Sequence, residues 1–198
     1  MTAAKPSDPR RLVLASGSPR RRELLSALGL PIEVRPVDID ETPFEGEVAD
    51  VYVSRLAESK ARERGSAGEL ILAADTVVAI DGELLGKPVD REHARAMLRR
   101  LSNQSHQVHT GVAVWDPAED LLHAELSTTR VIFAELGEPE IEWYVESGEP
   151  MDKAGAYGIQ GLAALFVESI EGNYSNVVGL PLPTVRRLLG RHGYPIVG

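Results

Sequence analysis

The sequence predicts a mixed α/β fold in which helices flank one mixed β-sheet. Apolar runs of strand length alternate with stretches that repeat their apolar residues at helical spacing. Tight turns at 81–82 and 116–120 join neighbouring strands, whereas helices connect the others. Because tight turns give antiparallel pairs and helical crossovers give parallel ones, we expect both kinds in one sheet. The 198 residues, of which 43% are hydrophobic, suit a single domain with a substantial core.

The first half of the chain predicts two strand–helix units followed by a long buried strand. Ser18 is placed to cap a helix, Pro19 suits its first position, and Gly29 suits its end. In the next helix, apolar residues such as Val53 and Leu56 fall on one stripe. The expected elements, in order, are a strand at 12–15, a helix at 19–28, a strand at 32–37, a helix at 49–64 and a strand at 71–80.

The second half predicts short connections and three further helices. Asp81 and Gly82 favour a tight turn, and Asp90 can cap a helix that runs to Leu101. The expected elements are a strand at 83–85, a helix at 91–101, strands at 109–115 and 126–136, a helix at 138–146, a strand at 165–170 and a helix at 184–191. No repeat or linker divides them, so we expect a flexible extension at 1–11 and a single domain at 12–198.

The composition excludes several classes of protein. With 30 acidic and 21 basic residues, the net charge of −9 argues against a long nucleic acid or an anionic membrane as the main partner. The absence of cysteine excludes a disulfide framework, a thiolate nucleophile and a cysteine-ligated metal. The N-terminus lacks the apolar stretch of a signal peptide, and the most apolar segment, 71–80, is too short to span a bilayer. These features indicate a soluble protein of the cytoplasm.

The segment from Ser16 to Arg21 is the first candidate site, because it joins a strand to a helix N-terminus. Free backbone N–H groups and the helix dipole favour an anion there, and Ser16, Arg20 and Arg21 add donors. Six of the first 22 residues are basic and one is acidic. Cations in a first helical turn oppose the dipole, so a bound phosphate would compensate them. The alternative is an ordinary capped helix with solvated arginines.

Asp75 interrupts the apolar run at 71–80, and Lys60 lies within the apolar stripe of the preceding helix. A buried carboxylate without a partner is costly, so Asp75 should lie at a strand end, pair with a cation or bind a metal. Lys60 is aimed at the interior side, where it could meet that carboxylate or a phosphate. The alternatives are a purely structural ion pair for Asp75 and a lysine that snorkels to solvent for Lys60.

Three loops add weaker candidates. Lys87 follows a predicted hairpin in a Gly-Lys-Pro loop and suits a phosphate ligand. The acidic loop at 38–43 offers carboxylates, among them Glu41, to a hard divalent cation. In the glycine-rich stretch 152–161, the glycines permit close backbone approach to a flat ligand, and the Gln160 amide could recognise a base edge. The alternatives are a solvated lysine, a solvated acidic loop and a bulged connection.

Together these motifs resemble the Maf family of nucleotide pyrophosphatases, over nearly the whole chain from Leu12 and in the family's order. The matching segments are LASGSPRRRELL (14–25), DIDETP (38–43), LAESKA (56–61), LAADTVV (72–78), LGKP (85–88), DKAGAYGIQG (152–161) and NYSNVVGLPL (173–182). The resemblance implies a fold like that of the inosine triphosphatase-like house-cleaning enzymes, with an elongated sheet between two lobes around a nucleotide cleft. It also implies hydrolysis of a nucleoside triphosphate to the monophosphate and pyrophosphate, with magnesium or manganese.

The resemblance implies phosphate contacts for five of the candidate residues. Ser16, Arg20 and Arg21 would hold the triphosphate in the first turn. Lys60 and Lys87 would act as catalytic cations that add positive charge over the phosphates.

The resemblance assigns the chemistry and the choice of base to a second group of residues, which shares Arg20 with the phosphate-binding group. Asp75 would accept a proton from the water that attacks between the α- and β-phosphorus. Glu41 and Asp75 would hold the metal ion. Arg20, Thr76 and Gln160 would shape base selectivity.

The segment 153–161 is similar to the branch of the family that acts on dTTP and UTP, including modified pyrimidine nucleotides, and Gln160 is the main discriminator. Two alternatives stay open: the sister branch that acts on 7-methyl-GTP, and a non-enzymatic regulator of cell division and septum formation. The resemblance further suggests a homodimer, with a nucleoside triphosphate as the substrate and neither a long nucleic acid nor a membrane as a partner.

Overall fold

Seven strands form one mixed sheet along the length of the molecule. The structure, a computed structural model, describes residues 10–194 and 196. The strands are β1 (Arg11–Leu14), β2 (Ile32–Val34), β3 (Glu69–Ile80), β4 (Glu83–Leu85), β5 (Ser105–Asp116), β6 (Leu121–Phe133) and β7 (Val167–Glu171). Their order is β2-β1-β3-β5-β6-β7, with β4 paired to β3. β1 runs parallel to β2 and β3, and the other pairs are antiparallel, which confirms the predicted mixed sheet.

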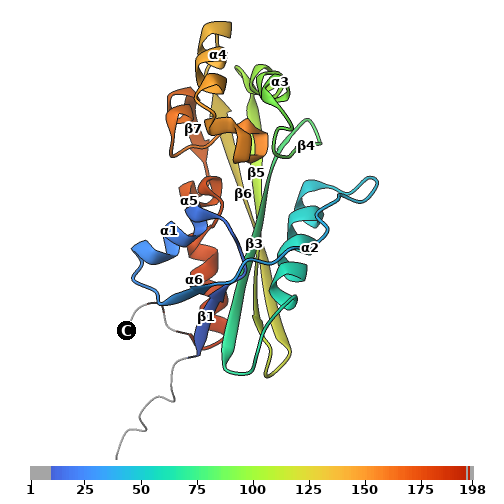
Figure 1. Cartoon of the computed structure of the whole chain (residues 1–198), viewed down its shortest axis with the longest axis vertical. Helices are drawn as coiled ribbons and strands as arrows, with labels where there is room; N and C mark the ends of the chain where they lie inside the picture. The colour runs from blue at the N-terminus through green and yellow to red at the C-terminus, as the bar shows by residue number, and fades with distance from the viewer. Residues whose placement is uncertain (1–9, 195, 197–198) are drawn as a thin grey trace, which may run out of the picture.

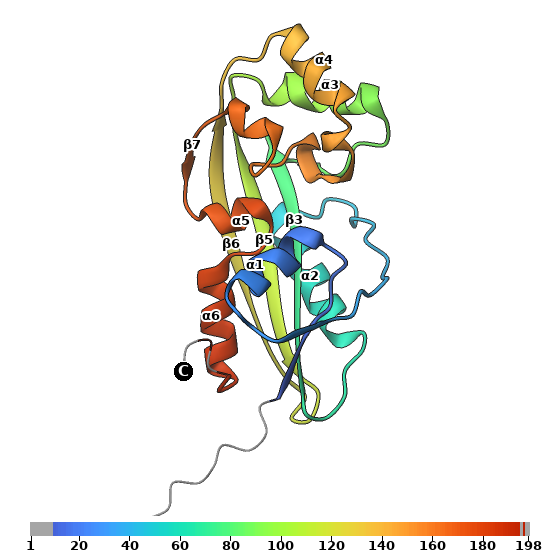
Figure 2. The ribbon, with the colours of Figure 1, turned by 60° about the vertical axis from the view of Figure 1, so that its left-hand side comes forward.

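Helices surround both ends of this sheet and divide the molecule into two lobes. They are α1 (Pro19–Ala27), α2 (Ala49–Arg62), α3 (Arg91–Leu101), α4 (Glu138–Glu146), α5 (Tyr174–Val178) and α6 (Leu182–Arg191), with 3₁₀ helices η1 (Glu149–Asp152), η2 (Ala154–Ala156) and η3 (Leu162–Phe166). Figures 1 and 2 show α3 and α4 at the upper end of β3, β5 and β6, and α1, α2 and α6 around their lower part. We call α3, α4, β4, β7 and the 3₁₀ helices the upper lobe, and α1, α2, α6, β1 and β2 the lower lobe.

Each lobe has its own hydrophobic core. Phe133 and Tyr144 are buried in the upper cluster, which the helices α3 and α4 cover. Leu72 and Leu188 belong to a lower cluster between the sheet and the helices α1 and α6. Ala57 of α2 packs into a third cluster on the opposite face of the sheet. The three long central strands are shared, so the two lobes are joined through continuous sheet.

Helix α2 lies very close to the sheet, and this contact positions its side chains. A Cβ atom added to Gly111 of β5 would lie 2.3 Å from the Val53 carbonyl oxygen, so only glycine permits this approach. The apolar stripe of α2 faces the sheet, and Lys60 lies within it as a buried residue. The close packing brings Lys60 to the middle of β3.

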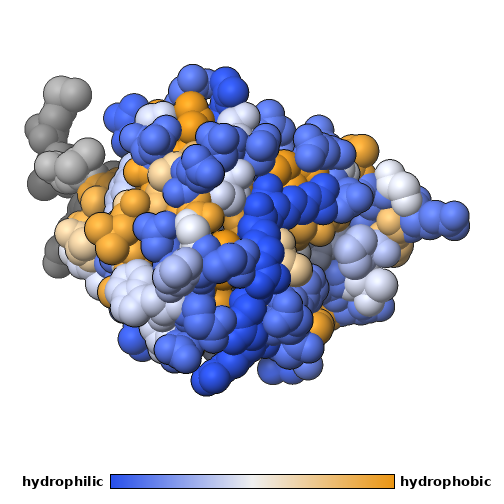
Figure 3. All heavy atoms as spheres, turned by 90° about the horizontal axis from the view of Figure 1, so that it is seen from above, coloured by the Kyte–Doolittle hydropathy of each residue, from blue (hydrophilic) through white to orange (hydrophobic). Residues whose placement is uncertain are grey.

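The outer surface of the upper lobe is largely charged. Ion pairs join α3 to α4 at Arg95–Glu142 (2.6 Å) and Arg99–Glu138 (2.8 Å). Seen from above, hydrophilic side chains cover most of this end, with smaller apolar patches between them (Figure 3).

The predicted order of strands and α-helices is confirmed, but several boundaries were wrong. Strand β2 ends at Val34 rather than at 37, α2 ends at Arg62 rather than at 64, and β6 begins at Leu121 rather than at 126. The short helix α5 and the 3₁₀ helices were not predicted. Residues 1–9 of the expected extension lie outside the described residues, whereas Arg11 opens β1. No helix in the part of the chain that the structure describes is long and apolar enough to cross a membrane.

Candidate active site

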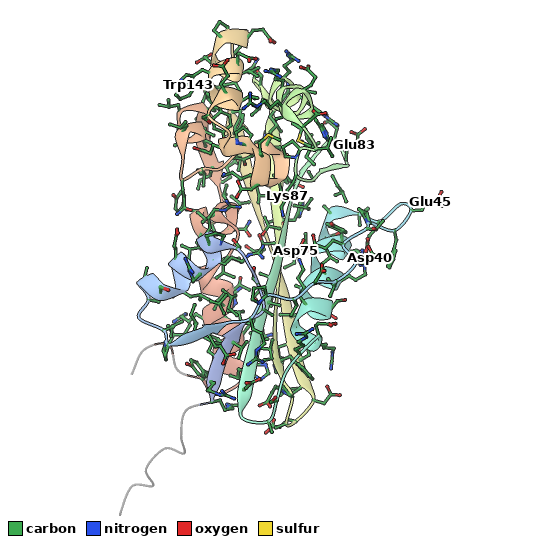
Figure 4. All side chains as sticks on the ribbon, viewed as in Figure 1. Asp40, Glu45, Asp75, Glu83, Lys87 and Trp143 are labelled. Carbon is green, nitrogen blue, oxygen red and sulfur yellow. The ribbon has the colours of Figure 1, made fainter. Side chains whose placement is uncertain are left out.

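A cavity of about 950 Å³ lies where the two lobes meet, and every predicted site residue lines it. These residues are Ser16, Arg20, Arg21, Glu41, Lys60, Asp75, Thr76, Lys87 and Gln160. Figure 4 shows Asp75 midway along β3 and Lys87 above it, while Asp40 and Glu45 lie further out on the loop before α2. The topology therefore collects at one place residues that are spread over 145 positions of the chain, from 16 to 160.

Lys60 lies between two carboxylates at the centre of this cavity. Its Nζ atom is 2.6 Å from Asp75 Oδ1 and 2.6 Å from Glu41 Oε1. The side chains of Lys60 and Asp75 are only 9% and 12% exposed, whereas that of Glu41 is 53% exposed. The Asp75 carboxylate also acts on Arg21: burial lowers the pKa of the Arg21 guanidinium, and Asp75 opposes that shift. Lys60 and Arg21 thus place two basic side chains next to the buried Asp75 carboxylate.

Tyr52 fixes the backbone of the acidic loop at the edge of the same group. Its phenol donates a hydrogen bond of 2.9 Å to the Glu41 carbonyl oxygen. Burial, followed by the nearby carboxylates of Asp75 and Glu41, raises the pKa of Tyr52 to about 12. The phenol therefore remains a donor throughout the neutral range and holds Glu41 near Lys60.

Arg21 connects three segments of the lower part of the cavity. Its donors reach Gly179 O (Nε, 2.8 Å), Ala74 O (Nη1, 2.7 Å), Ser16 Oγ (Nη1, 3.1 Å) and Thr76 Oγ1 (Nη2, 3.1 Å). Since a guanidinium has five N–H groups, these four contacts leave one N–H for a ligand. The arginine thus acts first as a brace that fixes Ser16 and Thr76.

The loop before α1 has the geometry expected of an anion site. Ser18 caps α1, with its side chain accepting from the Arg21 backbone N–H, and Pro19 follows as predicted. The Ser16 hydroxyl accepts from the Ser18 backbone N–H at 3.3 Å. The first turn of α1 contains no acidic residue, so its dipole and its cations face the cavity without an internal counter-charge in that turn.

Arg20 reaches across the cavity to the upper lobe. Its Nη1 atom lies 3.1 Å from Asp152 Oδ2, and the other oxygen of Asp152 accepts from Lys153 Nζ at 2.6 Å. Lys87 and Gln160 are exposed side chains of the upper lobe, on the loop after β4 and on the loop between η2 and η3. Ser16, Arg20 and Arg21 therefore line the cavity from the lower lobe, and Lys87 and the residues around Gln160 form the opposite wall.

The carboxylates do not form a ready-made metal cage. In residues 10–194 and 196, no group of three or more histidine, aspartate or glutamate side chains could hold a metal ion. Of the acidic loop, Asp40 accepts from the Thr42 backbone N–H at 2.9 Å, and only Glu41 pairs with Lys60. Among these side chains, Glu41 and Asp75 are the carboxylates that converge on Lys60.

Several polar residues that line the cavity had no role of their own in the sequence prediction, among them Tyr52, Glu149, Asp152 and Lys153. Tyr52 precedes Lys60 by eight positions, so the two share a helix face, and this spacing could have indicated it. Asp152 and Lys153 stand in the glycine-rich motif, but nothing in its pattern indicates that Asp152 pairs with Arg20.

Comparisons with known proteins find similar sequences over most of this chain. A family model described as Maf-like protein matches residues 11–192. A dTTP/UTP pyrophosphatase of Anaeromyxobacter dehalogenans is 55% identical over 94% of this chain and 96% of its own length. A protein of the same description from Myxococcus xanthus is 54% identical over 93% of this chain and 94% of its own. Among solved structures, the Staphylococcus aureus Ham1 protein is 15% identical, with a TM-score of 0.45 over 73% of this chain and 81% of that one.

Proposed function

The chain belongs to the Maf family, and from this premise we propose that it hydrolyses nucleoside triphosphates, dTTP and UTP in particular, to the monophosphate and pyrophosphate. The single observation that carries the proposal is the convergence of all nine predicted site residues on one cavity between the lobes. The names of relatives that are about half identical over more than nine-tenths of this chain support the same substrates. Modified pyrimidine nucleotides fall within the proposed range.

The lower lobe would bind the triphosphate. Ser16, the free N–H groups at the start of α1 and the side chain of Arg20 offer donors to phosphate oxygens. Arg21 braces this loop and has one N–H to spare. Lys87, exposed on the other side of the cavity, adds a cation over the phosphates. Such preorganised cations stabilise the charge that develops on the transferring group.

Asp75 would accept the proton of the attacking water. Its Oδ1 atom is held by Lys60, which leaves Oδ2 for the water. Lys60 keeps the carboxylate oriented and balances its charge in a buried setting. Hydrolysis between the α- and β-phosphorus then releases pyrophosphate as the leaving group.

A divalent cation, magnesium or manganese, would bind here through two carboxylates together with substrate phosphates and waters. Magnesium is often bound through one or two carboxylates together with substrate phosphates and waters. Glu41 and Asp75 supply such a pair, since both converge on the Lys60 ammonium. The ion would neutralise phosphate charge when bound. Glu41, with its half-exposed side chain, is the more accessible of the two ligands.

Base selectivity would come from the upper wall of the cavity and from its floor. Gln160 offers both a donor and an acceptor to a base edge. Thr76 is fixed by Arg21 and by a hydroxyl contact of 2.9 Å to Thr110, so its position is defined before a nucleotide enters. Arg20 lies between the phosphate loop and this wall.

A nucleotide panel tests the proposal. Pyrophosphate release, measured as kcat/KM with and without magnesium, should be highest for dTTP and UTP and should depend on the ion. Preference for 7-methyl-GTP would instead place the chain in the sister branch. Nucleotide binding without turnover would favour the regulator of cell division.

We also include the cytoplasm, a homodimeric state and the absence of a long nucleic acid partner in the proposal. Light scattering measures the mass in solution, and a mass near 21.5 kDa would contradict the dimer.

A further inference from the structure

Asp152 places a carboxylate between two cations inside the proposed nucleotide cavity. Its Oδ2 atom accepts from Arg20 at 3.1 Å, and its Oδ1 atom accepts from Lys153 at 2.6 Å. Burial by itself would raise the pKa of Asp152, but hydrogen bonds from Lys153 and Arg20 hold it below its usual value. Asp152 is therefore paired with Arg20, which the proposed reaction needs in order to bind a phosphate.

The Arg20–Asp152 pair also bridges the lobes. Arg20 belongs to α1 of the lower lobe, and Asp152 ends η1 of the upper lobe. Within the described part of the chain, no other ion pair joins α1, α2 or α6 to an upper-lobe helix. The two side chains are 28% and 63% exposed, and ion pairs that exposed contribute little to stability. Such a contact spans the cavity from one lobe to the other but can be broken readily.

Lys153 connects this bridge to the loop that carries Gln160. Its Nζ atom donates to the Glu149 carbonyl oxygen as well as to Asp152. Its stem crosses Gly158 so closely that a Cβ atom there would lie 2.7 Å from Lys153 Cε. A movement of Asp152 would therefore also displace the loop around Gln160, which is proposed to contact the base.

We propose that Asp152 is a reversible latch, which holds Arg20 and joins the lobes until an incoming polyphosphate takes Arg20 from it. A phosphate group with two negative charges is a stronger partner for a guanidinium than a single carboxylate. The latch rests on the proposed function, because it requires a polyanion in this cavity. Asp152 is in this sense a positioning residue, which acts through Arg20.

Anion affinity gives the first test. Pyrophosphate binding is measured by calorimetry for the wild type, for Asp152→Asn and for Asp120→Asn, a matched control that removes the same charge from an exposed Arg62–Asp120 pair. Removing the competing carboxylate should tighten binding about two- to five-fold, the range of an exposed ion pair, while Asp120→Asn should not change it. Unchanged or weaker binding to Asp152→Asn overturns the latch alone. A wild type that does not hydrolyse dTTP or UTP overturns the proposed function and the latch with it, and a wild type that hydrolyses them but binds no pyrophosphate overturns the latch alone.

The second test measures the distance between the lobes, which would not change if Asp152 acted only on its immediate neighbours. The chain has no cysteine, so Ser26→Cys on α1 and Glu146→Cys on α4, both exposed, provide the only thiols for spin labels. In the ligand-free protein, Asp152→Asn should broaden the distribution of distances between these labels, and Asp120→Asn should not. Identical distributions in all three backgrounds would show that the pair does not hold the lobes together.

Discussion

Two ion pairs line the same cavity, and they differ in the properties that set the strength of an ion pair. Lys60–Asp75 joins α2 to β3 at 2.6 Å, with side chains 9% and 12% exposed. Arg20–Asp152 joins α1 to η1 at 3.1 Å, with side chains 28% and 63% exposed. The first pair joins a lower-lobe helix to a shared central strand against which it packs tightly, and the second pair joins the two lobes.

The difference in exposure between the two ion pairs separates a fixed contact from one that can break. Two charges removed from water lose hydration, and they remain charged only if the geometry of the pair is good and further polar contacts support it. Lys60 has such support from Glu41. An exposed pair is screened by water and gains little. The buried pair therefore suits a group that must hold a defined orientation for chemistry, and the exposed pair suits a contact that forms and breaks.

The largest expected effect is on turnover, through Asp75. Asp75→Asn should lower kcat for dTTP about 10²- to 10⁴-fold, the usual contribution of a positioned general base. Asparagine keeps the shape of the side chain but cannot accept the proton. Pyrophosphate release measures the loss, and circular dichroism shows whether the fold is kept.

The matched control for this variant is Asp120→Asn, which removes a carboxylate from an exposed pair far along the sheet. Its turnover should equal that of the wild type. If Asp75→Asn retained turnover, Asp75 would not be the proton acceptor.

The second prediction compares the stability of the two pairs directly. Lys60→Met leaves the Asp75 carboxylate buried without its cation and should cost about 3–5 kcal/mol of unfolding free energy. Arg20→Met leaves Asp152 exposed and paired with Lys153, so it should cost less than about 1 kcal/mol. Urea unfolding of both variants measures the two costs. Equal costs would contradict the distinction between the pairs.

Much of the fold could be predicted from sequence, because its elements are marked locally. Ser18-Pro19 and Asp90 cap helices where their chemistry predicts, and the turn at Asp81 lies where the two strands meet. The boundaries of β6 could not be predicted, because its first residues form a strand only by pairing with β5, as in Trp115↔Leu122. Tertiary pairing overrides a weak local pattern in that segment.

The candidate site shows the same division. Asp75 and Lys60 could be found because each places a charge in an apolar pattern. Their pairing across 15 positions follows from the packing of α2 on the sheet. Asp152 could not be connected to Arg20 from sequence, because 132 positions separate them and only the meeting of the lobes joins them. Glu41, Lys87 and Gln160 were weaker candidates in the sequence, which the family resemblance strengthened, and the roles of all five residues remain predictions.

The last prediction extends the comparison to a buried group that has no counter-charge. His106 of β5 is 2% exposed and lies against the Phe133 ring and the Tyr157 hydroxyl, with Nε2 2.8 Å from that oxygen. Burial lowers the pKa of His106 to about 4. In an unfolded chain the pKa of a histidine is about 6.5. Below that pH the unfolded state binds a proton at His106 that the folded state does not bind. His106 thus contributes stability that is complete above about pH 6.5 and is lost as the pH falls towards 4.

The size of this loss follows from the separation of the two pKa values, at about 1.4 kcal/mol for each unit, so it should reach roughly 2–3 kcal/mol by pH 4. Urea unfolding at several pH values, for the wild type and for His106→Gln, isolates the contribution, since the other buried histidines are present in both. The wild type should lose more stability on acidification than the variant. Parallel curves would mean that His106 accepts a proton while folded. In that case burial would not by itself keep this imidazole neutral in the upper lobe.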